Sequence, residues 1–173
     1  MFPKIQQKIN KGEYKSCINH IDNLIKQEAN KEEDKDYLYF LRGMCYYKLQ
    51  NYKQASIDLE KAEATGDQRA FYFRAQCYRR TFNFAEALPL LSIASVSTPM
   101  QPDIESGGFA KITCFPFKTK QEIKIDQAAC FEIVGLFSSA DKCYQYILDS
   151  DLETQSSHRC KALAYEHFGD LEN

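Results

Sequence analysis

The chain has 173 residues and a mass of 20.0 kDa, the size of one domain or of one short array of repeats. Lys and Arg number 22 and Asp and Glu 24, and the net charge of −2 argues against a protein that binds nucleic acid by neutralising phosphates. Hydrophobic residues make up 44% and charged residues 27%, which excludes a wholly disordered chain, and the low Gly and Pro content favours helices.

No stretch of the sequence has the apolar length that a membrane span needs, which is about 18 to 20 residues. The opening residues, Met1 to Gln7, are too polar for a secretory signal and lack the Arg and Ser character of a transit peptide. Seven cysteines without an export signal indicate free thiols in a reducing compartment. We therefore expect a soluble, cytoplasmic protein.

Four segments share a pattern of a small residue, any residue, a second small residue and an aromatic residue. They begin at Gly43, Ala75, Ala128 and Ala162. In the first three, an alanine closes an aromatic-x-x-Ala signature twelve residues later, at Ala55, Ala87 and Ala140. This fixed offset predicts a repeated structural unit. The second and third units start 53 residues apart, against 32 and 34 elsewhere, which indicates an inserted loop of about twenty residues.

Within each unit the small and apolar residues recur every three or four positions, as on one face of a helix. Each unit is predicted to be a helical hairpin, in which small residues allow close approach and aromatic rings fill the space beside them. In chain order we expect helices at 2–10, 13–29, 35–49, 52–64, 68–81, 84–96, 120–134, 137–149 and 154–168. Pro89 falls inside the sixth, where we expect a kink or a later helix start.

This arrangement resembles the tetratricopeptide repeat (TPR) family, whose pattern is a Gly or Ala, an aromatic residue three later, an Ala twelve later, then an aromatic residue or Leu and another Ala. The best match consists of Gly43, Tyr46, Ala55, Leu59 and Ala62. The resemblance implies an all-α fold, a TPR-like α-α solenoid of about four to five helical hairpins with one loop insertion. It divides the chain into N-terminal TPR-like hairpins at 1–96, an insertion loop at 97–119, and a C-terminal TPR-like hairpin plus a final helix at 120–173.

The insertion, residues 97–119, breaks the repeat. Its first half is rich in Pro and Gly, whereas its second half is apolar and prone to β structure. Long apolar loops do not usually project into water. Two interpretations stay open. The loop packs back on the solenoid, or its aromatic residues Phe109, Phe115 and Phe117 dock a partner.

No pattern of residues points to catalysis or to metal binding. The sequence lacks a Cys-x-x-Cys pair, and Cys45, Cys77 and Cys130 share one repeat position, which indicates small packing residues rather than zinc ligands. None of the three histidines adjoins a Gly-rich turn, and no phosphate-binding loop follows Gly107 and Gly108. We therefore expect no enzyme, no catalytic residues, no cofactor and no metal.

In the resembled family, the first helix of each hairpin lines a concave groove. Carried over by register, the groove residues of two units are Tyr37, Phe40, Met44, Tyr47, Lys48, Arg69, Tyr72, Gln76, Arg79 and Arg80. The next unit contributes Glu122, Ile125, Glu132 and Ile133. An aromatic and Met-rich half beside an Arg-rich half suits an apolar, partly acidic segment. The alternative is that the N-terminal hairpin covers Tyr37, Phe40 and Tyr47, and that Arg79 and Arg80 form a solvated edge.

The final unit has only a first helix. Its apolar stripe, Ala162, Tyr165 and Phe168, is expected either to cap the array or to be completed by another subunit. The resemblance implies a non-catalytic protein–protein interaction scaffold or adaptor that uses its concave groove. The alternative is a permanent structural subunit of a large multiprotein assembly, with a cytoskeletal or ciliary location. The expected partners are other proteins, as a peptide segment or a larger assembly, with no nucleic acid, no membrane span and no small-molecule substrate.

Overall fold

The computed structural model describes residues 2–27, 32–96, 115, 118–151 and 154–169. These ranges contain helices joined by turns and no strand. The helices are α1 (Phe2–Asn10), α2 (Tyr14–Gln27), α3 (Glu32–Lys48), α4 (Tyr52–Ala62), α5 (Gln68–Arg80), α6 (Phe84–Val96), α7 (Lys120–Ile133), α8 (Phe137–Leu148) and α9 (Gln155–Phe168), with a short 3-10 turn (Glu63–Thr65) after α4. The expected all-α fold is confirmed. Both ends of each expected helix lie within three residues of the ends of the observed helix.

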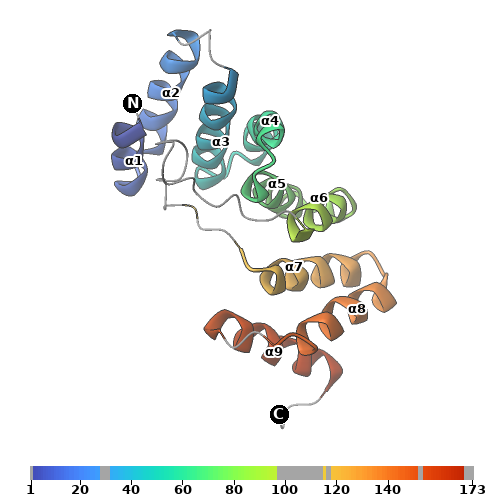
Figure 1. Cartoon of the computed structure of the whole chain (residues 1–173). Helices are drawn as coiled ribbons and strands as arrows, with labels where there is room; N and C mark the ends of the chain where they lie inside the picture. The colour runs from blue at the N-terminus through green and yellow to red at the C-terminus, as the bar shows by residue number, and fades with distance from the viewer. Residues whose placement is uncertain (1, 28–31, 97–114, 116–117, 152–153, 170–173) are drawn as a thin grey trace.

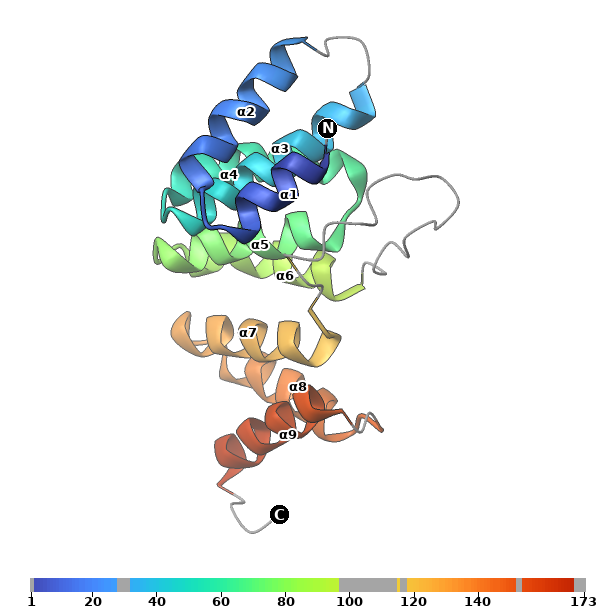
Figure 2. The same ribbon diagram turned by 90° about the vertical axis from the view of Figure 1, so that its left-hand side faces the viewer.

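The helices form a curved stack of antiparallel hairpins, α1–α2, α3–α4, α5–α6 and α7–α8, followed by the single helix α9 (Figure 1). The first helix of each hairpin, together with α9, lies on the inner side of the curve, and the second helices lie on the outer side. We call the inner side the concave face. A view turned by 90° looks onto this face and places α1 and α9 toward opposite ends of the stack (Figure 2).

Small side chains set the distance between the two helices of each hairpin. Ala75 and Ala128 are fully buried, as are Ala55, Ala87 and Ala140 on the second helices. At Gly43 a Cβ atom would lie 3.0 Å from Cγ of Leu59 and 3.3 Å from the carbonyl oxygen of Ala55. The glycine therefore lets α3 and α4 approach more closely than a larger residue would allow.

The helix α9 ends the described stack without a partner of its own. Ala162 stands at the repeat position of Ala75 and Ala128, yet it is exposed. Its opposite face, with Ser157, Cys160 and Ala164, is buried against α7 and α8. The exposed face of α9 carries small and polar residues beside the apolar Leu163 and Phe168, which are 39% and 45% exposed.

The turn inside each hairpin has the same backbone geometry. A residue with positive φ lies two positions before each second helix, and these residues are Gly12, Gln50, Phe82 and Gly135. Glycine adopts this left-handed conformation without steric cost, whereas Gln50 and Phe82 adopt it at a cost of about 1 kcal/mol each. The shared geometry explains why the offset between the small residue and the alanine is constant.

Pro89 does not delay the start of its helix. Helix α6 begins at Phe84 and contains Pro89 in its second turn, so of the two expected alternatives, a kink or a later start, the later start does not occur. Pro89 lacks the N–H group that would bond to the carbonyl of Ala85, but both residues are exposed. Water can therefore solvate that carbonyl, which keeps the cost of the proline low.

A charged cluster joins three helices in the N-terminal half. The Arg42 guanidinium on α3 donates hydrogen bonds of 2.7 and 2.8 Å to both carboxylate oxygens of the buried Asp58 on α4, and one of 2.5 Å to Asp22 on α2. The hydrogen bond to Asp58 raises the pKa of Arg42 above its ordinary value, so the guanidinium stays charged at any physiological pH. This cluster links α2 of the first hairpin to α3 and α4 of the second.

The first testable prediction concerns the hairpin contact. Ala128→Arg forces a long charged side chain into the contact between α7 and α8, so we expect the free energy of unfolding to fall by about 3 kcal/mol or more. Thermal unfolding followed by circular dichroism measures the loss. The matched control is Ala162→Arg, which places the same side chain in solvent and should shift the Tm by no more than about 2 °C. Equal losses in the two variants would contradict the burial of Ala128 in the contact between α7 and α8.

Candidate functional site

The N-terminal half of the concave face is filled by apolar side chains. Tyr37, Phe40 and Met44 on α3 lie there as the register predicts, but they are only 3%, 2% and 0% exposed. Tyr47 is half-buried against Tyr52 and Phe73, with ring centroids 5.7 and 5.5 Å apart. The expectation that these residues present an open surface therefore needs correction, because other side chains cover them. Lys48, at the end of α3, is exposed.

One covering residue comes from the insertion. Phe115 is 2% exposed and its ring meets the rings of Phe40 and Phe73 edge to face, at centroid distances of 6.3 and 6.4 Å. For Phe115 the structure thus supports the interpretation that the insertion packs back on the solenoid. Phe109 and Phe117, which were predicted to share its role, lie outside the described residues.

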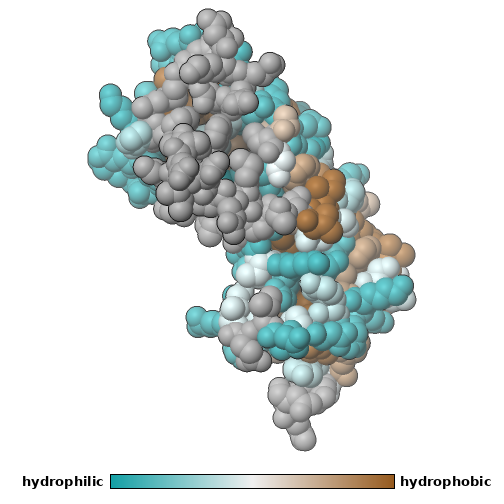
Figure 3. Space-filling view, in the orientation of Figure 1, coloured by the Kyte–Doolittle hydropathy of each residue, from teal (hydrophilic) through white to brown (hydrophobic). Residues whose placement is uncertain are grey.

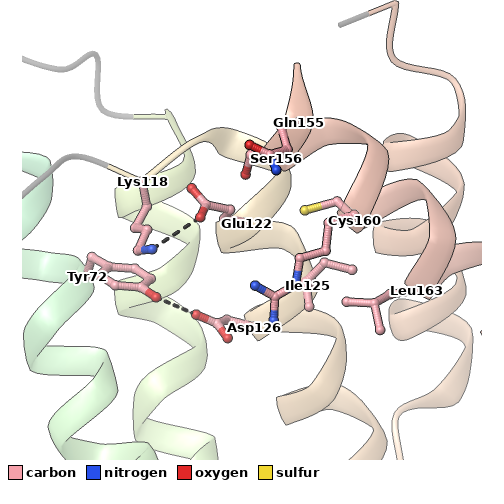
Figure 4. A pocket seen from close by; sticks show the side chains of 10 residues that line it. Tyr72, Lys118, Glu122, Ile125, Asp126, Gln155, Ser156, Cys160 and Leu163 are labelled. Carbon is pink, nitrogen blue, oxygen red and sulfur yellow. Dashed lines mark hydrogen bonds and ion pairs between the residues drawn. The ribbon is translucent and has the colours of Figure 1, made fainter. Parts of the chain in front are cut away.

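The C-terminal half of the concave face is hollowed. A pocket of about 510 Å³ opens among α5, α7 and α9 (Figure 4). A second hollow of about 360 Å³ shares Tyr72 and Asp126 with it. The larger pocket is lined by Tyr72, Lys118, Glu122, Ile125, Asp126, Gln155, Ser156, Arg159, Cys160 and Leu163. The smaller one adds Gln76, Arg79, Arg80 and Phe84. We call the two together the open groove.

Asp126 organises the middle of the open groove. Its carboxylate accepts hydrogen bonds of 2.7 Å from the Tyr72 hydroxyl and 2.7 Å from the Gln76 amide, and it also pairs with Arg79. The three donors lie on α5 and Asp126 on α7, so this contact joins adjacent hairpins across the groove. Burial, reinforced by the nearby Asp126 charge, raises the pKa of Tyr72, which keeps the hydroxyl protonated and donating.

At the rim, Lys118 and Glu122 form an ion pair of 3.1 Å at the start of α7. Thr119 caps this helix, since its hydroxyl accepts from the Glu122 N–H and the Glu122 carboxylate accepts from the Thr119 N–H at 2.8 Å. Burial alone would raise the pKa of Glu122, but the Thr119 N–H and Lys118 together lower it below its ordinary value. The rim is therefore a fixed, charged feature at neutral pH.

The open groove carries more positive than negative charge. Four cationic side chains, Arg79, Arg80, Lys118 and Arg159, face two anionic ones, Glu122 and Asp126. Arg79 and Lys118 are paired with those two acids, whereas Arg80 and Arg159 are exposed. Ile125 and Leu163 supply apolar surface between them. This mixture suits a ligand with acidic and apolar groups.

Cys160 lines the pocket but does not have the properties of a nucleophile. It is 4% exposed, and burial raises the pKa of its thiol. The same cause raises the pKa of Cys77 to about 12 and that of Cys130 above its ordinary value. Because the thiolate is the reactive form, these side chains act as small packing groups. In the part of the chain that the structure describes, no three His, Cys, Asp or Glu side chains come together as a metal site.

The structure separates the ten predicted groove residues into two groups. Tyr72, Gln76, Arg79 and Arg80 meet in the open groove, together with Glu122 and Ile125 of the next unit. Arg69 is 7% exposed and held by Asp67 through an ion pair of 2.6 Å, so it belongs to the filled half. Sequence reasoning missed Ser156, Arg159 and Leu163, although the same repeat register continued onto α9 would have identified them. Asp126 was missed because it stands one position beyond that register.

Apolar surface also lies away from the concave face. Figure 3 shows hydrophobic patches over α6 and near the turn between α7 and α8. The exposed apolar side chains of these regions include Val96, Ile133, Leu136 and Phe137, which are 74%, 59%, 51% and 63% exposed. This is the surface that a permanent structural subunit would have to cover. Within the described residues, no helix has the length and apolar character needed to cross a bilayer.

Comparison with solved structures identifies the fold. MamA superimposes with a TM-score of 0.64 at 15% identity, over 96% of this chain and 85% of its own. YrrB, described as a TPR protein with an unusual peptide-binding site, superimposes with a TM-score of 0.64 at 16% identity, over 97% and 76%. The TPR-like solenoid expected from the sequence is therefore confirmed. No protein-family model matches the sequence, and a comparison with curated proteins also gives no match.

A second prediction tests the role of Asp126. Asp126→Ala leaves Tyr72, Gln76 and Arg79 without their shared acceptor, so we expect the free energy of unfolding to fall by about 2 kcal/mol. Urea unfolding measures the change. Asp151→Ala removes an exposed carboxylate and should cost less than about 0.5 kcal/mol. The account fails if Asp126→Ala is no more destabilising than this control.

Proposed function

We propose that the chain is a non-catalytic protein-interaction scaffold that binds a peptide segment of a partner in the open groove. The observation that carries the proposal is the continuity of the two hollows at Tyr72 and Asp126, which together extend across α5, α7 and α9. A continuous groove along several helices suits an extended segment better than a compact small molecule. YrrB, which shares the fold, is described as having a peptide-binding site.

The charge of the groove indicates the chemistry of that segment. Arg80 lines the smaller hollow and Arg159 the larger pocket, and Asp126 lines both. Both arginines are exposed and can form ion pairs with acidic side chains of a ligand. Ile125 and Leu163 offer apolar contact between them. The preferred ligand is therefore an extended segment with acidic residues flanking an apolar one. Such a segment would gain association rate from the charges and affinity from the apolar contact.

Several parts of this proposal rest on the sequence alone. The proposed cytoplasmic location rests on the seven cysteines, which suit a reducing compartment. The proposed non-catalytic role rests on the lack of a catalytic motif in the sequence. The alternative of a permanent subunit in a cytoskeletal or ciliary assembly has less support, because the described groove is open.

The third prediction tests the groove. Peptides selected from a random displayed library against the immobilised full chain should be enriched in acidic residues around an apolar one. Their affinity is then measured by fluorescence anisotropy with the wild type and with the double variant Arg80→Glu, Arg159→Glu. Reversal of two exposed positive charges should weaken binding by at least about tenfold, with helicity unchanged.

The matched control is Lys53→Glu, which reverses an exposed charge on the outer helix α4. This variant should bind the selected peptides with the affinity of the wild type. Selected peptides that bind the double variant as tightly as the wild type would overturn the groove assignment. A folded wild-type chain that selects no peptide would overturn the proposed function itself.

A further inference from the structure

The filled half of the concave face contains an aromatic cage built by two helices. Phe40 on α3 and Phe73 on α5 contact the edge of the Phe115 ring at angles of 87° and 71°. Tyr37 stacks beside Phe40 at 6.0 Å, and Tyr47 meets Phe73 at 5.5 Å. Edge-to-face pairs of this kind add about 1 kcal/mol each to the burial of a ring. The cage therefore suits a flat aromatic side chain.

Arg69 gives the same site a contact for the backbone. Its Nη1 atom lies 3.4 Å from the carbonyl oxygen of Phe115 and donates to it, while its guanidinium carbon lies 5.0 Å above the Phe40 ring. Asp67 holds the Arg69 side chain through hydrogen bonds of 2.6 to 3.1 Å. Because Asp67 neutralises Arg69, the site has no demand for an acidic ligand. It offers ring contacts to one aromatic side chain and one donor to a carbonyl group.

Phe115 differs from the other core residues of this half, because it belongs to no helix and reaches the cage from the insertion. A site that recognises one aromatic side chain and the carbonyl of the same residue is suited to a short extended segment. We infer that the cage formed by Phe40, Phe73 and Arg69 is a binding site for an aromatic residue in a partner's extended segment, and that Phe115 occupies this site in cis. The site is distinct from the open groove and prefers neutral, aromatic ligands rather than acidic ones.

Phe115 and an aromatic residue of a partner compete for the cage, and Phe115 has the advantage of belonging to the same chain. A residue on the same chain has an effective concentration of the order of millimolar, so Phe115 excludes a separate segment that binds only weakly. A partner must supply either a higher affinity or a second contact, for example in the open groove. Occupation of the cage by Phe115 thus excludes aromatic peptides that bind only weakly.

The fourth prediction uses the chain's own sequence as the probe. A fluorescein-labelled peptide of residues 110–119 is titrated against the full-length wild type and against Phe115→Ala. Removal of the cis ligand should empty the cage, so we expect the variant to bind the peptide at least about tenfold more tightly than the wild type. The same peptide with Ala in place of Phe115 should not bind either chain. Phe137→Ala, which removes a 63% exposed phenylalanine, should behave as the wild type.

Four outcomes would overturn the inference. The first is equal affinity of the wild type and Phe115→Ala for the peptide. The second is loss of the helical signal in Phe115→Ala, because a displaceable ligand cannot be essential to the fold. The third is binding of the Ala-substituted peptide. The fourth is a wild-type dimer that Phe115→Ala converts to a monomer, which would make a second copy the occupant.

The single variant Arg159→Glu separates this inference from the proposed function. Introduced together with Phe115→Ala, it should leave binding of the 110–119 peptide unchanged, because Arg159 lies on α9, away from the cage, whereas Arg80 interacts with the Tyr47 side chain. Loss of peptide binding in the combined variant would place the peptide in the open groove and overturn the cage as its site. Failure of the acidic peptides in the open groove would leave the expected result with Phe115→Ala unaffected.

Discussion

Close approach of paired helices at small side chains is the constraint on which the rest of the structure depends. Ala55, Ala87 and Ala140 are fully buried against the preceding helices, and Gly43 leaves no room for a Cβ atom without displacing Leu59. This spacing fixes which residues of each first helix turn toward the concave face. The positive-φ residue in each hairpin turn then preserves the register from one unit to the next. The binding surface is a consequence of this packing rather than of any local motif.

The concave face has two parts that differ in chemistry and in accessibility. Near α3 and α5 it is aromatic, buried and occupied by Phe115, whereas across α5, α7 and α9 it is charged, hollow and open. Tyr72 and Phe73 are neighbours in sequence, and their rings meet edge to face at 5.3 Å, so the two parts lie on either side of one turn of α5. A single extended partner could contact both, with acidic side chains in one part and an aromatic residue in the other.

The sequence predicted the helices well because each position rests on the same short-range rule. Small residues every three or four positions and a constant twelve-residue offset locate both helices of a hairpin, whatever lies far away in the chain. Burial of Phe40 and Met44 could not be predicted in this way, since a register states which face a residue is on and not what covers it. The covering residue, Phe115, lies in a segment with no periodicity. Arg159 and Leu163 obey the register and could have been found, whereas Asp126 depends on the geometry between two hairpins.

The division of the concave face is tested most directly by nuclear Overhauser effects in the isotopically labelled full chain. Ring protons of Phe115 should show cross-peaks to ring protons of both Phe40 and Phe73, with chemical shifts displaced by the neighbouring rings. Random-coil shifts for Phe115 without cross-peaks to either ring, in a chain whose helices are otherwise intact, would contradict the account. That result would mean that the aromatic half of the concave face is not held by the chain itself.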